Sequence, residues 1–175
     1  MSTIKTKKNN IFSLFFILFI LTSFSSCFAK EKGNKDLLLV RLKYGTIKIK
    51  LLPNKAPNTV KRISKLANDK FYNGITFHRV IPGFVAQAGD PTGTGMGGSG
   101  KKLSAEFNDV EHVRGTVAMA RKGNDVNSAD SQFYISLNTL DHLNGKYTVF
   151  GQVVSGIELI DQIKKGDKII EMTAN

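Results

Sequence analysis

The sequence contains a single cysteine, Cys27, among its 175 residues. No intramolecular disulfide can therefore form. A domain of this length buries most of the surface that its unfolded chain exposes, so it does not need a cross-link. Cys27 also precedes the region that we expect to fold. A cysteine nucleophile in the folded domain is therefore excluded.

Residues for metal or serine chemistry are equally scarce. The three histidines, His78, His112 and His142, are far apart and form no H-x-x-x-H or H-E pair. Metal sites usually draw two or more ligands from such short spacings, so no metal site is predicted. No G-x-S-x-G nucleophile motif occurs either. We expect a protein without a metal or cofactor.

The sequence has no apolar run long enough to span a bilayer. Its longest, residues 11–21, holds eleven residues with one serine, whereas a transmembrane helix needs ~20. Three lysines precede the run and small polar residues follow it, an order typical of a secretory signal. We therefore predict a signal segment over 1–29 and export to the bacterial cell envelope.

Two ways of processing this segment stay open. Cys27 follows "FSS", which resembles a loose lipobox and predicts lipidation at Cys27. Alternatively, cleavage after Ala29 would release a soluble periplasmic protein. The chain would contact a membrane only through such a lipid.

Acidic residues are few, and the formal net charge is +11. Three lysines and no acids lie in residues 1–29, which leaves +8 on the remainder. The remaining lysines are scattered and form no dense basic helix with interleaved aromatics. We expect a solvated basic surface and no nucleic-acid partner. Nothing calls for an oligomer, so we expect a monomer.

The mature part divides into a polar tether, residues 30–36, and one domain, residues 37–175. Apolar residues alternate with lysines around Tyr44-Gly45, which predicts a hairpin over 37–52. Pro57, followed by Val60, Ile63 and Leu66 at helical spacing, predicts a helix. Short β-branched or aromatic runs predict further strands at 75–81, 83–89, 115–120, 131–137, 147–154 and 168–173.

A second helix is predicted near residues 155–166. Ser155 and Glu158 have the spacing of a capping box. Ile157, Ile160 and Ile163 mark one apolar stripe, and Gly166 fits the position after a helix end. Many short strands with two helices predict a mainly β fold, an antiparallel barrel or sandwich with helices at its ends.

A glycine-rich stretch at 89–100 imitates two nucleotide-binding motifs. Residues 93–98 match G-x-G-x-x-G, but no helix can begin in so glycine-rich a segment. Residues 95–101 match G-x-x-x-x-G-K, but Lys102 stands where a P-loop has Ser or Thr. We interpret these glycines as giving backbone freedom beside a bound chain.

The stretches "FHRVIPGFVAQAGDPTGTGMGG", "GTVAMA", "DSQFYISL" and "LNGKYTVFGQVVSG" resemble the cyclophilins, the peptidyl-prolyl cis-trans isomerases. The resemblance runs in order from about Leu37 to Thr173. It implies a closed eight-stranded antiparallel β-barrel capped by two α-helices. It also implies rotation about X-Pro bonds of polypeptide substrates to assist folding, without a covalent intermediate or cofactor.

The resemblance assigns the catalytic role to Arg79 and substrate positioning to Gln87. It places the proline ring against Phe84, Val85, Tyr134 and Leu143. The implied substrate-binding surface also includes Met119, Ala120, Gln132, His142 and Tyr147.

These residue types suit the chemistry. The barrier to rotation, ~18–20 kcal/mol, arises because the nitrogen lone pair is delocalised. A guanidinium that donates a hydrogen bond to this nitrogen stabilises the twisted transition state, and it stays charged at any working pH. We expect Arg79 to be the one cation in an apolar cleft. The alternative is a module that binds proline segments with little turnover.

Some positions differ from many members of the family. Arg121 replaces a frequent asparagine, and Tyr134 replaces phenylalanine and adds a hydroxyl at the pocket. His142 stands where many members have tryptophan. This difference predicts weak binding of cyclosporin, a ligand of the family.

Overall fold

The computed structural model describes Met1 and residues 36–175, which form eight strands, one α-helix and two 3-10 helices. The predicted signal segment, Cys27 and residues 30–35 of the tether lie outside the described residues. The strands are β1 Leu37–Leu42, β2 Gly45–Leu51, β3 Arg79–Ile81, β4 Val85–Ala88, β5 Thr116–Met119, β6 Phe133–Ser136, β7 Val149–Ser155 and β8 Glu171–Ala174. The helices are α1 Pro57–Asn68, η1 Asp141–Leu143 and η2 Ile157–Gln162.

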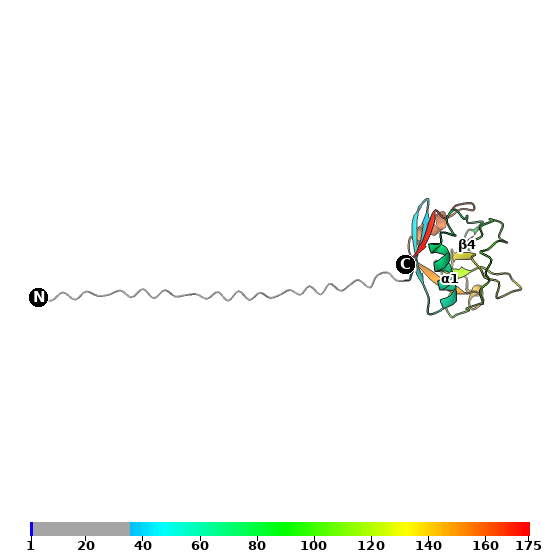
Figure 1. Cartoon of the computed structure of the whole chain (residues 1–175), viewed down its shortest axis with the longest axis horizontal. Helices are drawn as coiled ribbons and strands as arrows, with labels where there is room; N and C mark the ends of the chain where they lie inside the picture. Colours follow the sequence, from blue (N-terminus) through cyan, green and yellow to red (C-terminus); the bar gives the residue numbers. More distant parts are fainter. Residues whose placement is uncertain (2–35) are drawn as a thin grey trace. The chain divides into compact units, whose positions relative to one another are not determined.

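All eight strands belong to one antiparallel sheet, in the order β3-β4-β6-β5-β7-β2-β1-β8. Each predicted strand run overlaps one of these strands. The hairpin turns at Lys43-Tyr44, one residue before the expected Tyr44-Gly45, because Gly45 already pairs with Leu42. Figure 1 shows β8 beside the β1–β2 hairpin and α1 against the sheet. The prediction of a mainly β, antiparallel fold is confirmed.

The sheet is open and curled into a half-barrel, so the prediction of a closed barrel is not confirmed. β3 and β8 are its edges, and no ladder joins them. An isolated bridge, Thr76 with Lys168, links the segments that precede these two strands. The few backbone hydrogen bonds between these two segments include Phe77 N–H to Asp167 O at 2.8 Å and Ile169 N–H to Ile75 O at 2.9 Å.

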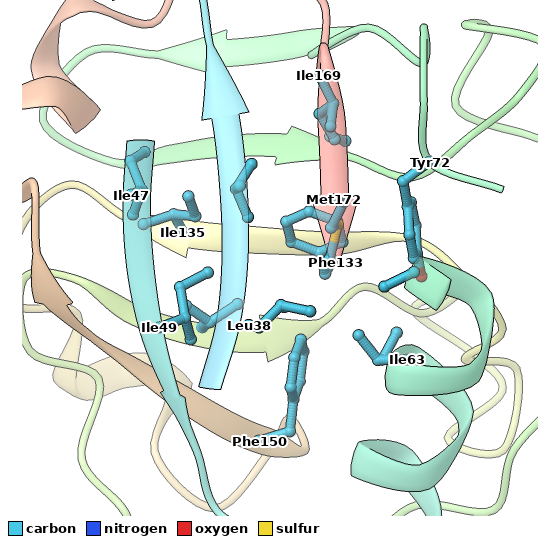
Figure 2. Close-up of a cluster of buried hydrophobic side chains, with 14 of the residues drawn as sticks. Leu38, Ile47, Ile49, Ile63, Tyr72, Phe133, Ile135, Phe150, Ile169 and Met172 are labelled. Carbon is cyan, nitrogen blue, oxygen red and sulfur yellow. The ribbon is translucent and has the colours of Figure 1, made fainter. Parts of the chain in front are cut away.

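Helix α1 covers one face of the sheet with the apolar stripe that its sequence predicts. Its buried residues include Val60, Ile63 and Leu66. Figure 2 shows Ile63 of α1 turned toward Phe150 and the strand side chains of the core. Tyr72, which follows the helix, packs on Phe133 with ring centroids 5.7 Å apart. The helix has no capping side chain of its own.

The side chain that satisfies the start of α1 comes from a distant loop. The carboxylate of Glu106 accepts hydrogen bonds from the backbone N–H groups of Asn58 and Thr59, at 2.9 and 2.8 Å. These are two of the N–H groups that a helix start leaves unpaired, and the positive end of the helix dipole favours the negative charge. This contact fixes the 106–110 loop against the helix.

The second helix is a 3-10 helix and lacks the predicted capping box. Ser155 still belongs to β7, where it pairs with Lys48 of β2. The cap residue is Gly156, in the left-handed region at φ 77°, and it makes no side-chain capping bond. Strand pairing extends β7 one residue too far for Ser155 to cap the helix, and the helix ends at Gln162.

Candidate active site

A cavity of about 180 Å³ brings together most of the predicted site residues. We call it the smaller cavity. The β3–β4 hairpin supplies Arg79, Phe84, Val85 and Gln87. The other predicted residues on its wall are Ala120, Tyr134, Leu143 and Tyr147.

Strand register places Arg79 beside Gln87. The two residues are cross-strand partners between β3 and β4. Arg79 Nη1 donates to Gln87 Oε1 at 3.3 Å, and Gln87 Nε2 donates to Gln132 Oε1 at 2.9 Å. The Arg79 guanidinium lies 5.5 Å from the centroid of the Phe84 ring. It has no carboxylate partner among residues 36–175, so most of its N–H donors are available to a ligand.

The floor of the smaller cavity is apolar and firmly packed. Val85 and Tyr134 are buried and belong to a cluster separate from the main core. Phe84, Leu143 and Tyr147 are partly buried and pack against this cluster. An apolar floor beside a guanidinium suits a ligand that joins a hydrocarbon ring to a polar backbone.

The Tyr134 hydroxyl bonds to a buried histidine that the sequence analysis left without a role. His112 is fully buried, and its Nε2 lies 2.9 Å from the Tyr134 oxygen. The backbone N–H of His112 donates to Asn144 Oδ1 at 2.8 Å, and Nδ1 lies 3.1 Å from the same oxygen. Nδ1 therefore carries the proton, and Tyr134 donates to Nε2.

Burial sets the protonation of this pair. It lowers the pKa of His112 and raises that of Tyr134 far above its ordinary value. The imidazole is therefore neutral and the phenol keeps its proton. The Tyr134 hydroxyl, predicted to modify the pocket, is instead used in fixing the ring that forms the pocket floor.

The glycine-rich loop is organised by a carboxylate of its own chain. Asp90 is 1% exposed and accepts hydrogen bonds from Thr92 N–H at 2.7 Å and Gly95 N–H at 2.5 Å. Burial raises the pKa of Asp90. Hydrogen bonds from Thr92, Gly97 and Gly95 lower it by more, so the pKa lies well below its usual range. A carboxylate thus occupies the N–H groups that a phosphate would need, which argues against nucleotide binding.

Three predicted residues do not line the smaller cavity. Met119 is 1% exposed and packs in the main core. His142 is exposed and stacks on Phe84, with ring centroids 5.9 Å apart. Gln132 lines a neighbouring cavity, where its Nε2 donates to the carbonyls of Gly95 and Gly97 at 3.0 and 2.8 Å.

The expectation of a single cation in the cleft is wrong. Arg121 also lines the smaller cavity, and its guanidinium lies 4.7 Å from the centroid of the Tyr147 ring. Its position directly after Ala120, on the predicted substrate surface, was a usable signal. Nothing in the sequence indicated a role for His112, because its partners Tyr134 and Asn144 are distant from it in the chain.

The described residues hold no group of three or more histidine, cysteine, aspartate or glutamate side chains arranged for a metal ion. Within the same part of the chain, no helix has the length and apolar character needed to cross a bilayer.

Comparison with known proteins places this geometry in context. Residues 37–173 match the family model described as cyclophilin type peptidyl-prolyl cis-trans isomerase/CLD. A peptidyl-prolyl cis-trans isomerase of Synechococcus elongatus is 45% identical over 130 residues, covering 73% of this chain and 88% of the relative. Peptidyl-prolyl cis-trans isomerase B of Bacillus subtilis is 45% identical over 147 residues, covering 83% of this chain and 94% of the relative.

A solved structure supports the same comparison. The crystal structure of a Cryptosporidium parvum cyclophilin-type isomerase, determined in the presence of the dipeptide Ala-Pro, superposes with a TM-score of 0.74 at 28% identity. The match covers 79% of this chain and 98% of that structure.

Proposed function

The chain belongs to the cyclophilin-type peptidyl-prolyl cis-trans isomerase family and catalyses rotation about X-Pro bonds, and we propose that Arg79 and the smaller cavity carry out this reaction. The observation that supports this assignment is the guanidinium of Arg79 beside the apolar floor of a cavity of about 180 Å³. In this arrangement the proline ring occupies the cavity and the guanidinium lies over the prolyl nitrogen.

Arg79 stabilises the twisted transition state. Rotation breaks the amide resonance and returns the lone pair to the prolyl nitrogen. An N–H group of Arg79 donates to that lone pair, a bond that forms only when the amide twists, so it lowers the barrier without stabilising the ground state. No bond to the protein forms, and the substrate atoms exchange only their orientation.

Gln87 acts mainly on Arg79. Its Oε1 accepts from Arg79, and its Nε2 donates to Gln132. Gln132 in turn donates to the glycine-rich loop through Gly95 and Gly97. This chain of amides holds the guanidinium at one height above the cavity. A second N–H of Gln87 is left to hydrogen-bond the substrate backbone.

The floor keeps the ring still while the preceding carbonyl turns. Phe84, Val85, Tyr134 and Leu143 surround an apolar ring, and the bond from Tyr134 to His112 prevents the floor from shifting. With the prolyl ring held still, only the carbonyl side of the X-Pro bond must rotate, so less orientational freedom is lost in reaching the transition state.

The test is a protease-coupled prolyl-peptide assay. We expect Arg79→Ala to lower kcat/KM at least tenfold, since a hydrogen bond from a charged donor contributes ~1.5–3 kcal/mol. Arg41→Ala is the matched control, because Arg41 is exposed on β1 and pairs with Glu171 at 3.0 Å. Binding of a labelled prolyl peptide should persist in Arg79→Ala. Equal turnover in the two variants would contradict the role of Arg79.

We also propose export. The support is the order of basic, apolar and small residues in 1–29, together with Cys27 behind "FSS". The enzyme then acts on proline-containing polypeptides in the bacterial envelope, as a monomer held there by a lipid on Cys27. Cleavage after Ala29 is the competing route and would give a soluble periplasmic enzyme.

A further inference from the structure

A second and larger cavity, of about 380 Å³, adjoins the smaller one. The two cavities share Gln87, Ala120 and Arg121. The glycine-rich loop and the 120–130 loop supply the rest of its wall. Because the cavities share these wall residues and an extended chain advances about 3.3 Å per residue, a residue within three positions of a proline in the smaller cavity would reach the larger one.

The wall of the larger cavity is positively charged. Arg121, Lys102 and Lys122 line it, and Asp130 is the only carboxylate among the described residues that do so. Both oxygens of Asp130 already have partners: Ser99 and Arg62 contact one, and the Gly100 N–H donates to the other at 2.8 Å. Lys102 contacts Asp125 at 3.1 Å in an exposed pair.

The guanidinium of Arg121 is fixed in place before any ligand binds. Its Nε donates to Lys146 O at 3.1 Å, and its Nη1 donates to Lys122 O at 3.0 Å. It also lies over the rings of Tyr147 and Phe107, with centroid distances of 4.7 and 5.9 Å. Its Nη2 has no hydrogen-bond acceptor among residues 36–175. A held guanidinium with a free N–H edge is a preorganised site for a carboxylate.

We propose that the larger cavity binds a carboxylate side chain of the substrate, so that the enzyme prefers prolyl peptides with glutamate within three residues of the proline. This preference rests on the proposed function, since it assumes that proline occupies the smaller cavity. Met96 and Arg121 both line the cavity, so a glutamate could place its apolar stem against Met96 and its carboxylate at Arg121, and aspartate has one methylene fewer with which to do so.

The test measures peptide binding directly. Labelled alanine-rich peptides with one proline carry Glu, Gln or Lys at each of the three positions on either side. Gln is the neutral isostere of Glu, so the ratio of the two Kd values isolates the charge. We expect Glu to bind about two to five times more tightly than Gln at one position, since partly exposed ion pairs contribute up to about 1 kcal/mol. About 1 M salt, which shortens the Debye length to about 3 Å, should remove most of the difference.

Matched variants separate the cavity from the general positive charge. Arg121→Gln, and Lys102→Gln combined with Lys122→Gln, should each lower the Glu-to-Gln ratio at least twofold. Lys48→Gln combined with Lys50→Gln removes the same charge as the double variant from the exposed face of β2 and should leave the ratio unchanged. A ratio of one at all six positions, or an equal loss in the β2 variant, would overturn the proposal.

Turnover of the all-alanine reference peptide is scored separately. Its absence would contradict the proposed function, whereas the Kd ratio tests the carboxylate preference independently of turnover. Turnover of the reference peptide with a ratio of one would reject the preference and leave the isomerase assignment intact.

Discussion

At the residue scale, the buried pair of Tyr134 and His112 connects the pocket floor to the core. Removing only the Tyr134 hydroxyl leaves His112 Nε2 buried without a donor. We expect Tyr134→Phe to lower the free energy of unfolding by about 1–3 kcal/mol, as measured by urea denaturation at pH 7.5.

Tyr147→Phe is the control for this measurement. Tyr147 also lines the smaller cavity, but its hydroxyl makes no hydrogen bond to residues 36–175. Its loss should change stability by less than about 0.5 kcal/mol. Equal effects of the two substitutions would mean that the bond to His112 adds no stability.

The same histidine makes stability depend on pH. Burial holds the pKa of His112 below its ordinary value of about 6.5, so the unfolded chain binds more protons than the fold just below that pH. Stability should therefore decrease as the pH falls from about 7.5 to about 5. His112→Gln should show a shallower decrease in urea denaturation, with the remainder due to His78, whose pKa burial also lowers. An unchanged slope would contradict this.

We expect His142 to govern a different property, the binding of cyclosporin. The ring is exposed and stacks on Phe84 at an interplanar angle of 13°. The resemblance places a tryptophan here in many family members. Imidazole offers less apolar area than indole, and each Å² of apolar surface that a ligand buries contributes ~25 cal/mol to binding. We expect weak inhibition of turnover by cyclosporin and stronger inhibition of His142→Trp. Equally tight inhibition of both proteins would show that position 142 does not control the drug.

At the element scale, the glycine-rich loop depends on close packing around Asp90. Gly97 has no left-handed φ, but a Cβ there would overlap the Asp90 carboxylate and Thr92. Gly97→Ala should therefore displace the loop that Gln132 holds. We expect a lower melting temperature and a kcat/KM reduced several-fold. Gly123→Ala is the matched control, because nothing lies within 4 Å of its added Cβ. Equal melting temperatures and kcat/KM values for the two variants would contradict this account.

The elements differ in how well the sequence predicts them. The hairpin of β1 and β2 follows from local alternation, because one face of each strand is buried. Helix α1 likewise follows from Pro57 and its apolar stripe. The capping box fails because Ser155 pairs with Lys48 across the sheet, a contact that is about a hundred residues away in the chain. Local spacing cannot express such competition.

The candidate site shows the same division. The residues of the β3–β4 hairpin lie close in sequence, within one of the stretches that carry the family resemblance, so the resemblance grouped them. The positively charged wall of the larger cavity is formed by Arg121, Lys102 and Lys122, and it arises only where separate loops meet. Scattered lysines in the sequence gave no reason to place any two of them together.

At the scale of the whole molecule, an open half-barrel places both cavities along β4, β5 and β6. Gln87 on β4 and Ala120 just after β5 belong to both walls. The main core lies between the sheet and α1, while the smaller cluster of Val85 and Tyr134 supports the cavity floor. Substitutions in the main core should therefore act on stability first and on turnover only indirectly.

Lipidation of Cys27 would determine whether the whole chain is held at a membrane. Lipid on Cys27 would add buried CH₂ groups worth ~0.8 kcal/mol each, so the native protein should partition into detergent and Cys27→Ser should not. Mass spectrometry of the mature N-terminus identifies the modified residue directly. If the signal were an ordinary secretory one, cleavage after Ala29 would remove position 27. Cys27→Ala and wild type would then have the same mature N-terminus and the same partitioning. A free N-terminus at Lys30 in the wild type would therefore contradict lipidation while supporting export, because both routes need the apolar run at 11–21 and only one needs the thiol.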